Sequence, residues 1–203
     1  LTEEITSIGI NAFSGCVGLR ELVLPNGLVS IENSAFSGCA GLTELTLPEG
    51  VERIDSYAFS KCKGLTEVRL PESVKSLGAY VFQNCTELRN VNYPSGLEEV
   101  NGAGGVFAGC VKLTRMEVPE GVTALPDYTF YDCDNFRTIL LPSTLISIGT
   151  RAFEDCTALE KIWVGEQVSS VKVYAFRNCA ALTIHGVAGS YIQSYAQENS
   201  IPF

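Results

Sequence analysis

Hydrophobic residues recur along this chain with a period of 23 residues. The stretch LTELTLPEGVERIDSYAFSKCKG, which begins at Leu42, shows the template: L-x-x-L-x-L-P, then V-x-x-I, then A-F-x-x-C. A period of this length is typical of solenoids, in which each unit forms one coil and buries its apolar side chains by stacking on the next coil. Full units begin at Leu19, Leu42, Leu65, Leu88, Leu113, Phe136 and Leu159.

Each unit predicts two short strands and a turn. In the L-x-L segment Leu45 and Leu47 point inward and Thr46 points outward, because side chains alternate across a strand. The proline that follows in six successive units ends this strand, since proline has no N–H to donate to a ladder. The V-x-x-I segment predicts a second, very short strand on the return path, and the A-F-x-x-C segment predicts a tight helical turn on the outer face.

The phenylalanines and cysteines form two inward columns, one residue of each type per unit. Eight of the ten phenylalanines occupy the A-F position, and burial of such a side chain stabilises a coil by roughly 1.5–3 kcal/mol. We interpret the eight cysteines as small buried thiols, because a disulfide framework is rarely so regular. Disulfides between neighbouring coils remain an alternative, since coils about 4.8 Å apart are within reach of a bridge, although parallel Cβ vectors disfavour it. The cysteines are Cys16, Cys39, Cys62, Cys85, Cys110, Cys133, Cys156 and Cys179.

The pattern divides residues 1–203 into a partial repeat over 1–18, seven full repeats over 19–181 and a C-terminal cap over 182–203. The first unit lacks its strand, so we expect the chain to be a fragment of a longer protein. In the cap, Ser190 is a candidate N-cap for a short amphipathic helix. The unit that begins at Leu88 is 25 residues long, and its extra residues lie in the segment NGAGG, residues 101–105. We expect this insertion to loop out without breaking the stack.

Composition and charge exclude several classes of function. No apolar run reaches the length of about 18 residues that a membrane span needs. The net charge of −9 argues against a nucleic-acid partner, which would require a basic stripe. A single histidine, His185, allows no His-based zinc site, and the cysteine spacing is not that of a C-x-x-C metal site. We therefore predict no catalytic residue, no metal and no cofactor, and we do not expect an enzyme.

The outward positions of the L-x-L strands are the part of the sequence that folding explains least. One column of outward residues runs from acidic to basic along the chain, and stacked glutamates favour a basic partner. The other column ends in Leu140 and Trp163, which resemble an interface anchor unless the cap covers Trp163. A merely solvated face is the alternative interpretation. The candidate ligand-binding residues are Glu21, Glu44, Glu67, Arg69, Asn92, Arg115, Leu140, Lys161 and Trp163.

The repeats LTELTLPEGVERIDSYAFSKC, LTEVRLPESVKSLGAYVFQNC and FRTILLPSTLISIGTRAFEDC resemble BspA-type leucine-rich repeats. The resemblance covers nearly the whole chain and implies an α/β-type right-handed superhelix with a concave parallel sheet. It also implies a secreted or cell-surface bacterial protein, not an enzyme, that binds a host or matrix protein, a glycan or another cell through the concave sheet. We expect a monomer. The alternative is a passive stalk or scaffold within a larger surface protein. The family has no invariant binding residues that could be transferred to this sequence.

Overall fold

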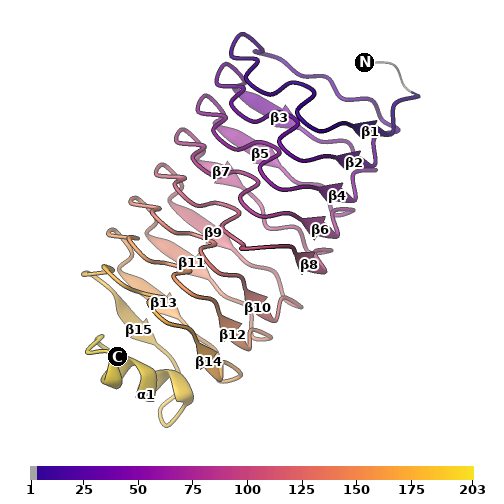
Figure 1. The fold of residues 1–203 in the computed structure, drawn as a ribbon. Helices are drawn as coiled ribbons and strands as arrows, with labels where there is room; N and C mark the ends of the chain where they lie inside the picture. Colours follow the sequence, from indigo (N-terminus) through magenta and orange to yellow (C-terminus); the bar gives the residue numbers. More distant parts are fainter. Residues whose placement is uncertain (1–3) are drawn as a thin grey trace.

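The computed structural model describes residues 4–203, which form a single stack of parallel coils that ends in one helix (Figure 1). Leu1, Thr2 and Glu3 of the predicted partial repeat lie outside the described residues. Most coils contribute one short parallel strand to each of two faces of the stack, so the predicted solenoid is confirmed. The unit that begins at Leu19 has a strand only on the return path.

The first sheet is built from the L-x-L segments. In its three-residue strands the central residue is buried and its two neighbours are largely exposed, as the alternation of inward and outward side chains requires. The strands pair in the register of the repeat, for example Leu45 opposite Val68. They are β3 (Glu44–Thr46), β5 (Glu67–Arg69), β7 (Asn90–Val91), β9 (Arg115–Glu117), β11 (Thr138–Leu140), β13 (Lys161–Trp163) and β15 (Thr183–His185).

The second sheet is built from the V-x-x-I segments, which confirms the short return strand. Its strands have two residues each, and the second residue of each strand faces inward. They are β1 (Ser7–Ile8), β2 (Ser30–Ile31), β4 (Arg53–Ile54), β6 (Ser76–Leu77), β8 (Glu99–Val100), β10 (Ala124–Leu125), β12 (Ser147–Ile148) and β14 (Ser170–Val171).

The A-F-x-x-C segments form a turn edge that joins all the coils. Each segment is a series of hydrogen-bonded turns, where we expected a helical turn, because Tyr57 and Lys61 and their equivalents have left-handed backbone angles near φ = 60° that a helix does not contain. The backbone N–H of Phe59 donates to the carbonyl of Val81 in the next coil at 3.0 Å. This bonding repeats from coil to coil and makes the turn edge a third ladder.

The Phe and Cys columns fill the core beside the turn edge. Consecutive Phe rings stack with centroids 5.1 Å apart at Phe13–Phe36 and 5.9 Å apart at Phe82–Phe107. The eight cysteines are free thiols, as we predicted. From Cys39 onward each thiol donates to the carbonyl of the Phe in the preceding coil, at 3.0–3.3 Å. Because most of these carbonyls also accept the backbone N–H of the Cys in their own turn, the thiol adds a second hydrogen bond that joins neighbouring coils.

The helix α1 (Tyr191–Glu198) covers the last coil with Ile192 and Ala196. Ser190 occupies its N-cap position with extended backbone, but its side chain makes no capping hydrogen bond, so the predicted cap is present in position only. The backbone N–H of Ile184 in β15 donates to the carbonyl of Pro202 at 2.8 Å, which pairs the end of the chain with the last strand.

The stack of coils continues past the insertion, as we expected, but the strand pairing of both sheets is interrupted there. Within residues 4–203, β7 ends one part of the first sheet and β9 begins the other, and β8 and β10 are likewise unpaired. We call this junction the seam. The backbone ladder of the turn edge does cross it, where the N–H of Gly105 donates to Asp127 at 2.8 Å and the N–H of Phe107 donates to Thr129 at 3.1 Å.

Proline explains part of the break in the second sheet. Where Gly78 and Asn101 donate their backbone N–H to the preceding coil at 2.7 Å, the equivalent residue after β10 is Pro126, which has no N–H. Gly104 and Gly105 both have positive φ, a conformation that glycine adopts without steric cost.

Candidate functional site

The outward face of the first sheet carries the predicted site residues in two columns, as their spacing required. Thr138 lies between Arg115 and Lys161, and Leu140 lies between Glu117 and Trp163. Eight of the nine predicted residues are exposed, and Asn92 is half-buried.

Asn92 has a structural role that the sequence did not reveal. Its side-chain oxygen accepts from the backbone N–H of Leu70 and its amide nitrogen donates to the carbonyl of Leu70, both at 2.8 Å. The side chain therefore pairs with β5 as a strand backbone would. We conclude that both polar groups of the Asn92 side chain form hydrogen bonds that stabilise the fold.

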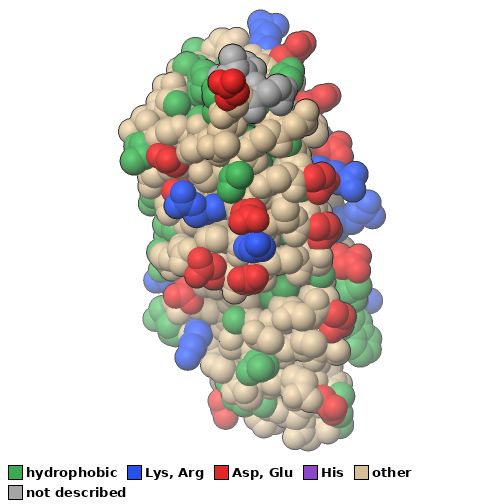
Figure 2. All heavy atoms as spheres, turned by 90° about the vertical axis from the view of Figure 1, so that its right-hand side faces the viewer, with side chains coloured by type: hydrophobic (Ala, Val, Ile, Leu, Met, Phe, Trp, Pro, Cys, Tyr) green, Lys and Arg blue, Asp and Glu red, His purple; other side chains and the backbone are tan. Residues whose placement is uncertain are grey.

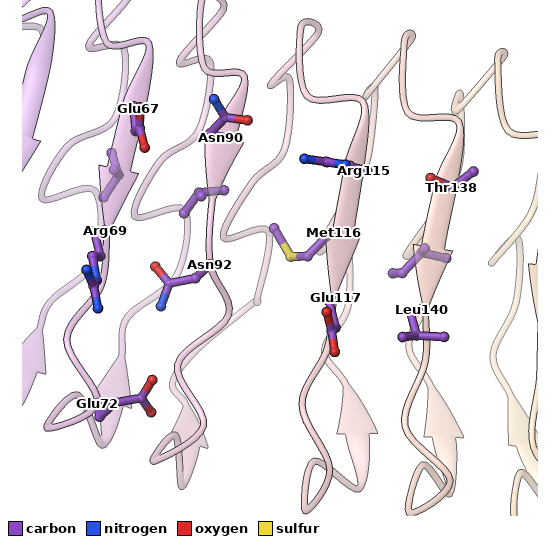
Figure 3. Close-up of a pocket in the computed structure, with 13 residues that line it drawn as sticks. Glu67, Arg69, Glu72, Asn90, Asn92, Arg115, Met116, Glu117, Thr138 and Leu140 are labelled. Atoms are coloured by element: carbon purple, nitrogen blue, oxygen red, sulfur yellow. The ribbon is translucent and has the colours of Figure 1, made fainter.

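A groove of about 880 Å³ lies on this face, across β5, β7, β9 and β11 (Figure 3). It contains five of the predicted residues, Glu67, Arg69, Asn92, Arg115 and Leu140. The other four predicted residues lie outside it. Lining residues that we had not predicted are Val68, Glu72, Asn90, Val91, Met116, Glu117, Thr138 and Ile139.

The groove is centred on the seam. In Figure 3 the gap between β7 and β9 is wider than the gap between β9 and β11, and Arg115 points from β9 toward β7. A smaller cavity of about 350 Å³, lined by residues that include Tyr93 and Pro126, opens the same junction on the second sheet. In the sequence, the NGAGG insertion and Pro126 mark the junction at which the groove and the smaller cavity lie. The insertion was recognised as a departure from the repeat, and Pro126 was not.

Most of the charged side chains in the groove are not used in contacts within the protein. Among the described residues, no ion pair involves Glu67, Arg69, Arg115 or Glu117. Glu72 differs, because its carboxylate accepts from the backbone N–H and hydroxyl of Ser95 in the next coil. Four charged groups of both signs therefore remain available to a ligand.

An apolar patch adjoins the groove on the C-terminal side. Leu140 is 58% exposed and Trp163 is 63% exposed, so α1 does not cover the tryptophan. The Trp163 ring stacks on His185 with centroids 4.7 Å apart. Nε2 of His185 is buried and has no hydrogen-bond partner among the residues that the structure describes. His185 was not among the predicted residues, although the alignment of T-I-H with K-I-W places it beside Trp163.

The face of the second sheet contrasts with this surface. Its outward strand residues are mostly small, including Ser30, Ser76, Ser147 and Ser170. Figure 2 looks onto this side and shows acidic and basic side chains interspersed, mainly over the N-terminal half. Large exposed side chains that do not fill the core are therefore more common on the first sheet than on the second.

A charged cluster on the turn edge has a structural explanation. The buried carboxylate of Glu154 lies 3.2 Å from Arg151 and 3.4 Å from Arg177. Both guanidinium groups lie over the ring of Tyr174 at 5.2–5.3 Å, a cation–π arrangement. These contacts hold neighbouring coils together.

The described residues give no other chemical centre. Within 4–203, no group of three or more His, Cys, Asp or Glu side chains is arranged to hold a metal ion. The one helix in this range is too short and too polar to cross a membrane. Burial raises the pKa of the Cys62 thiol to about 12, which makes it a poor nucleophile.

A sequence profile described as "BspA type Leucine rich repeat region" matches residues 1–104 and 103–201. No curated protein matches the chain in sequence.

Solved structures of bacterial leucine-rich repeat proteins share the fold. A leucine-rich repeat protein from Bacteroides ovatus is 26% identical over 92% of this chain, with a TM-score of 0.77, and this chain spans 55% of it. The T. pallidum leucine-rich repeat protein is 32% identical over 76% of this chain and 72% of its own, with a TM-score of 0.71. A leucine-rich cell surface protein from Faecalibacterium prausnitzii is 25% identical over 97% of this chain and 61% of its own, with a TM-score of 0.56.

Proposed function

The chain belongs to the BspA-type leucine-rich repeat family, and from this premise we propose that it is an extracellular recognition module that binds a host or matrix protein through the outward face of the first sheet. Leucine-rich repeats generally serve as protein-interaction scaffolds and are typically not enzymes. One structural relative is a cell surface protein, which supports the same location for this chain. The module acts as a monomer, with residues 19–181 as the recognition unit and residues 182–203 as its cap.

The observation that carries this proposal is the exposed pair Leu140 and Trp163 beside the unpaired charges of the groove. Tryptophan is enriched among the residues that dominate binding energy, and such residues lie near the centre of an interface, surrounded by contacts that exclude water. Neither side chain is needed to fill the core, because the inward residue of each strand does that. A ligand that covered the pair would remove apolar surface from water, worth about 25 cal/mol per Å².

The experiment is a binding screen of the folded chain against extracellular matrix proteins and a glycan array. For any ligand found, we expect Trp163→Ala to weaken binding at least about tenfold, which corresponds to about 1.4 kcal/mol. Ile146→Ala is the matched control, because Ile146 is 47% exposed on the side of the second sheet. Glycan binding without protein binding would change the ligand class that we propose.

A passive stalk is the competing function. It predicts no ligand in either screen and no effect of Trp163→Ala on any surface interaction. Binding that is lost in Trp163→Ala and retained in Ile146→Ala would exclude it.

A further inference from the structure

The seam presents a free strand edge on each side of the groove. The edges of β7 and β9 face each other there, and no strand among the described residues pairs with either of them. Exposed strand edges are sites where another polypeptide can add as a further strand. The edge of β9 is the longer one, since β7 is two residues long and the Asn92 side chain turns back onto Leu70.

The backbone groups of β9 that point into the seam can be assigned. Thr114 accepts from the N–H of Thr138 at 3.3 Å, and the N–H of Val118 donates to Leu140 at 2.9 Å, so these residues serve the β11 side. Successive backbone groups of a strand point to opposite sides. The N–H and C=O groups of Arg115 and Glu117 therefore face β7 and lack a strand partner.

The floor of the seam is apolar and partly open. Val91 of β7 is only half-buried, whereas the equivalent inward residues Val68 and Ile139 are buried. Met116, the only methionine in the chain, leans from β9 toward the gap (Figure 3). Its flexible thioether can repack around an added side chain. An apolar residue of a partner would close this opening.

The charges on β9 specify the rest of the partner. Arg115 and Glu117 flank Met116 on the outward face, and neither forms an ion pair in the described part of the chain. On a strand that runs parallel to β9, side chains at the same level lie side by side, as Thr138 does beside Arg115. Charge complementarity then requires an acidic residue beside Arg115 and a basic residue beside Glu117.

We propose that an extended segment of a partner protein adds to the free edge of β9 as a parallel strand, with the sequence pattern acidic–apolar–basic in register with Arg115–Glu117. The inference deepens the proposed function by naming the partner's chemistry, and it rests on that function. Parallel addition continues the geometry of both flanking sheet segments, whose strands are all parallel.

The chain itself contains this pattern, which supplies a probe. Strand β5 reads Glu67–Val68–Arg69. A synthetic peptide with the sequence of residues 65–71, LTEVRLP, therefore presents the required acidic, apolar and basic side chains in a segment that already forms a strand in this fold. The charge-reversed peptide LTRVELP is the matched control, with the same composition and length.

The test is fluorescence anisotropy of the labelled peptides titrated with the intact 203-residue chain. We expect LTEVRLP to bind roughly tenfold more tightly than LTRVELP, and the double variant Arg115→Glu/Glu117→Arg to reverse that preference. An unchanged far-UV circular dichroism spectrum would show that the double variant is folded. No binding at millimolar concentration, or no reversal in the double variant, would overturn the proposal.

A second peptide separates strand pairing from charge attraction alone. In parallel pairing the N–H of the peptide valine points to β9, so methylation of that nitrogen should weaken binding roughly tenfold without changing any charge. Equal binding of the methylated and unmethylated peptides would exclude strand addition. Binding at the seam does not require Trp163, so Trp163→Ala should bind LTEVRLP normally. Failure of the peptide experiment and failure of the Leu140–Trp163 proposal can thus be told apart.

Discussion

The buried thiol column makes the stability of this fold sensitive to alkaline pH. Burial raises the pKa of Cys62 and Cys179 from 9.0 to about 12, and it raises the pKa of four thiols between them well above 9.0. In the unfolded chain these thiols have ordinary pKa values. The stability that the protonated thiols contribute is therefore complete below pH 9 and is lost as pH rises from about 9 toward 12.

The size of the effect follows from the number of thiols. At pH 10, ionisation of one thiol with a pKa of 9.0 lowers the free energy of the unfolded state by about 1.4 kcal/mol. Six such thiols give a loss of about 8 kcal/mol, which is of the order of the whole stability of a typical domain, about 5–15 kcal/mol. We expect the chain to unfold near pH 10 under conditions where it is stable at pH 8.

The measurement is urea unfolding followed by circular dichroism at pH 8, 9 and 10 in the presence of a reductant. Cys110→Ala should reduce the loss between pH 8 and pH 10 by roughly 1 kcal/mol, whereas Cys16→Ala, at an exposed thiol, should have a smaller effect. Comparing each variant with itself at two pH values removes the cost of the substitution at neutral pH. A free energy of unfolding that stays level from pH 8 to pH 10 would refute the reasoning.

Two further substitutions test how the coils are joined across the seam. Gly104→Ala should destabilise the chain by about 1–3 kcal/mol in urea unfolding, because a Cβ there would lie 2.1 Å from the carbonyl oxygen of Asp127. Gly121→Ala is the control and should cost less, because Gly121 also has a positive φ but an added Cβ would meet no atom within 4 Å. Phe107→Ala should cost about 3–5 kcal/mol and split unfolding into two transitions, because its ring stacks on Phe130 across the seam. Phe13→Ala, at the half-buried end of the column, should cost less and leave one transition.

The repeat itself was readable from the sequence because its inward positions are set by geometry that does not vary between coils. Leu45, Phe59 and Cys62 recur at fixed spacing since each must fill the same volume beside its counterpart in the next coil. The outward columns followed from the same alternation, and the register confirms them. The sequence therefore predicted the exposure of these residues, with Asn92 as the exception.

The turns and the seam could not be predicted in the same way. Tyrosine is a poor candidate for a left-handed backbone, yet Tyr57 and Tyr80 both adopt φ near 60° and stack their rings 5.3 Å apart. Ring stacking between coils offsets a local cost that propensity alone would count against the turn. The role of Asn92 likewise depends on where the backbone of Leu70 ends its pairing, which only the coordinates show.

The seam also explains why the groove lies where it does. A stack of identical coils presents a regular sheet, and its outward side chains differ without forming a hollow. The longer unit and Pro126 interrupt both ladders at one junction, where the outward column changes from Glu44 and Glu67 before the seam to Arg115 and Lys161 after it. A ligand that lies across the seam therefore contacts both charge types, free backbone groups and an apolar floor together. Recognition at this point depends on the departure from the repeat, while the repeat supplies the rigid turn edge that holds the two halves in place.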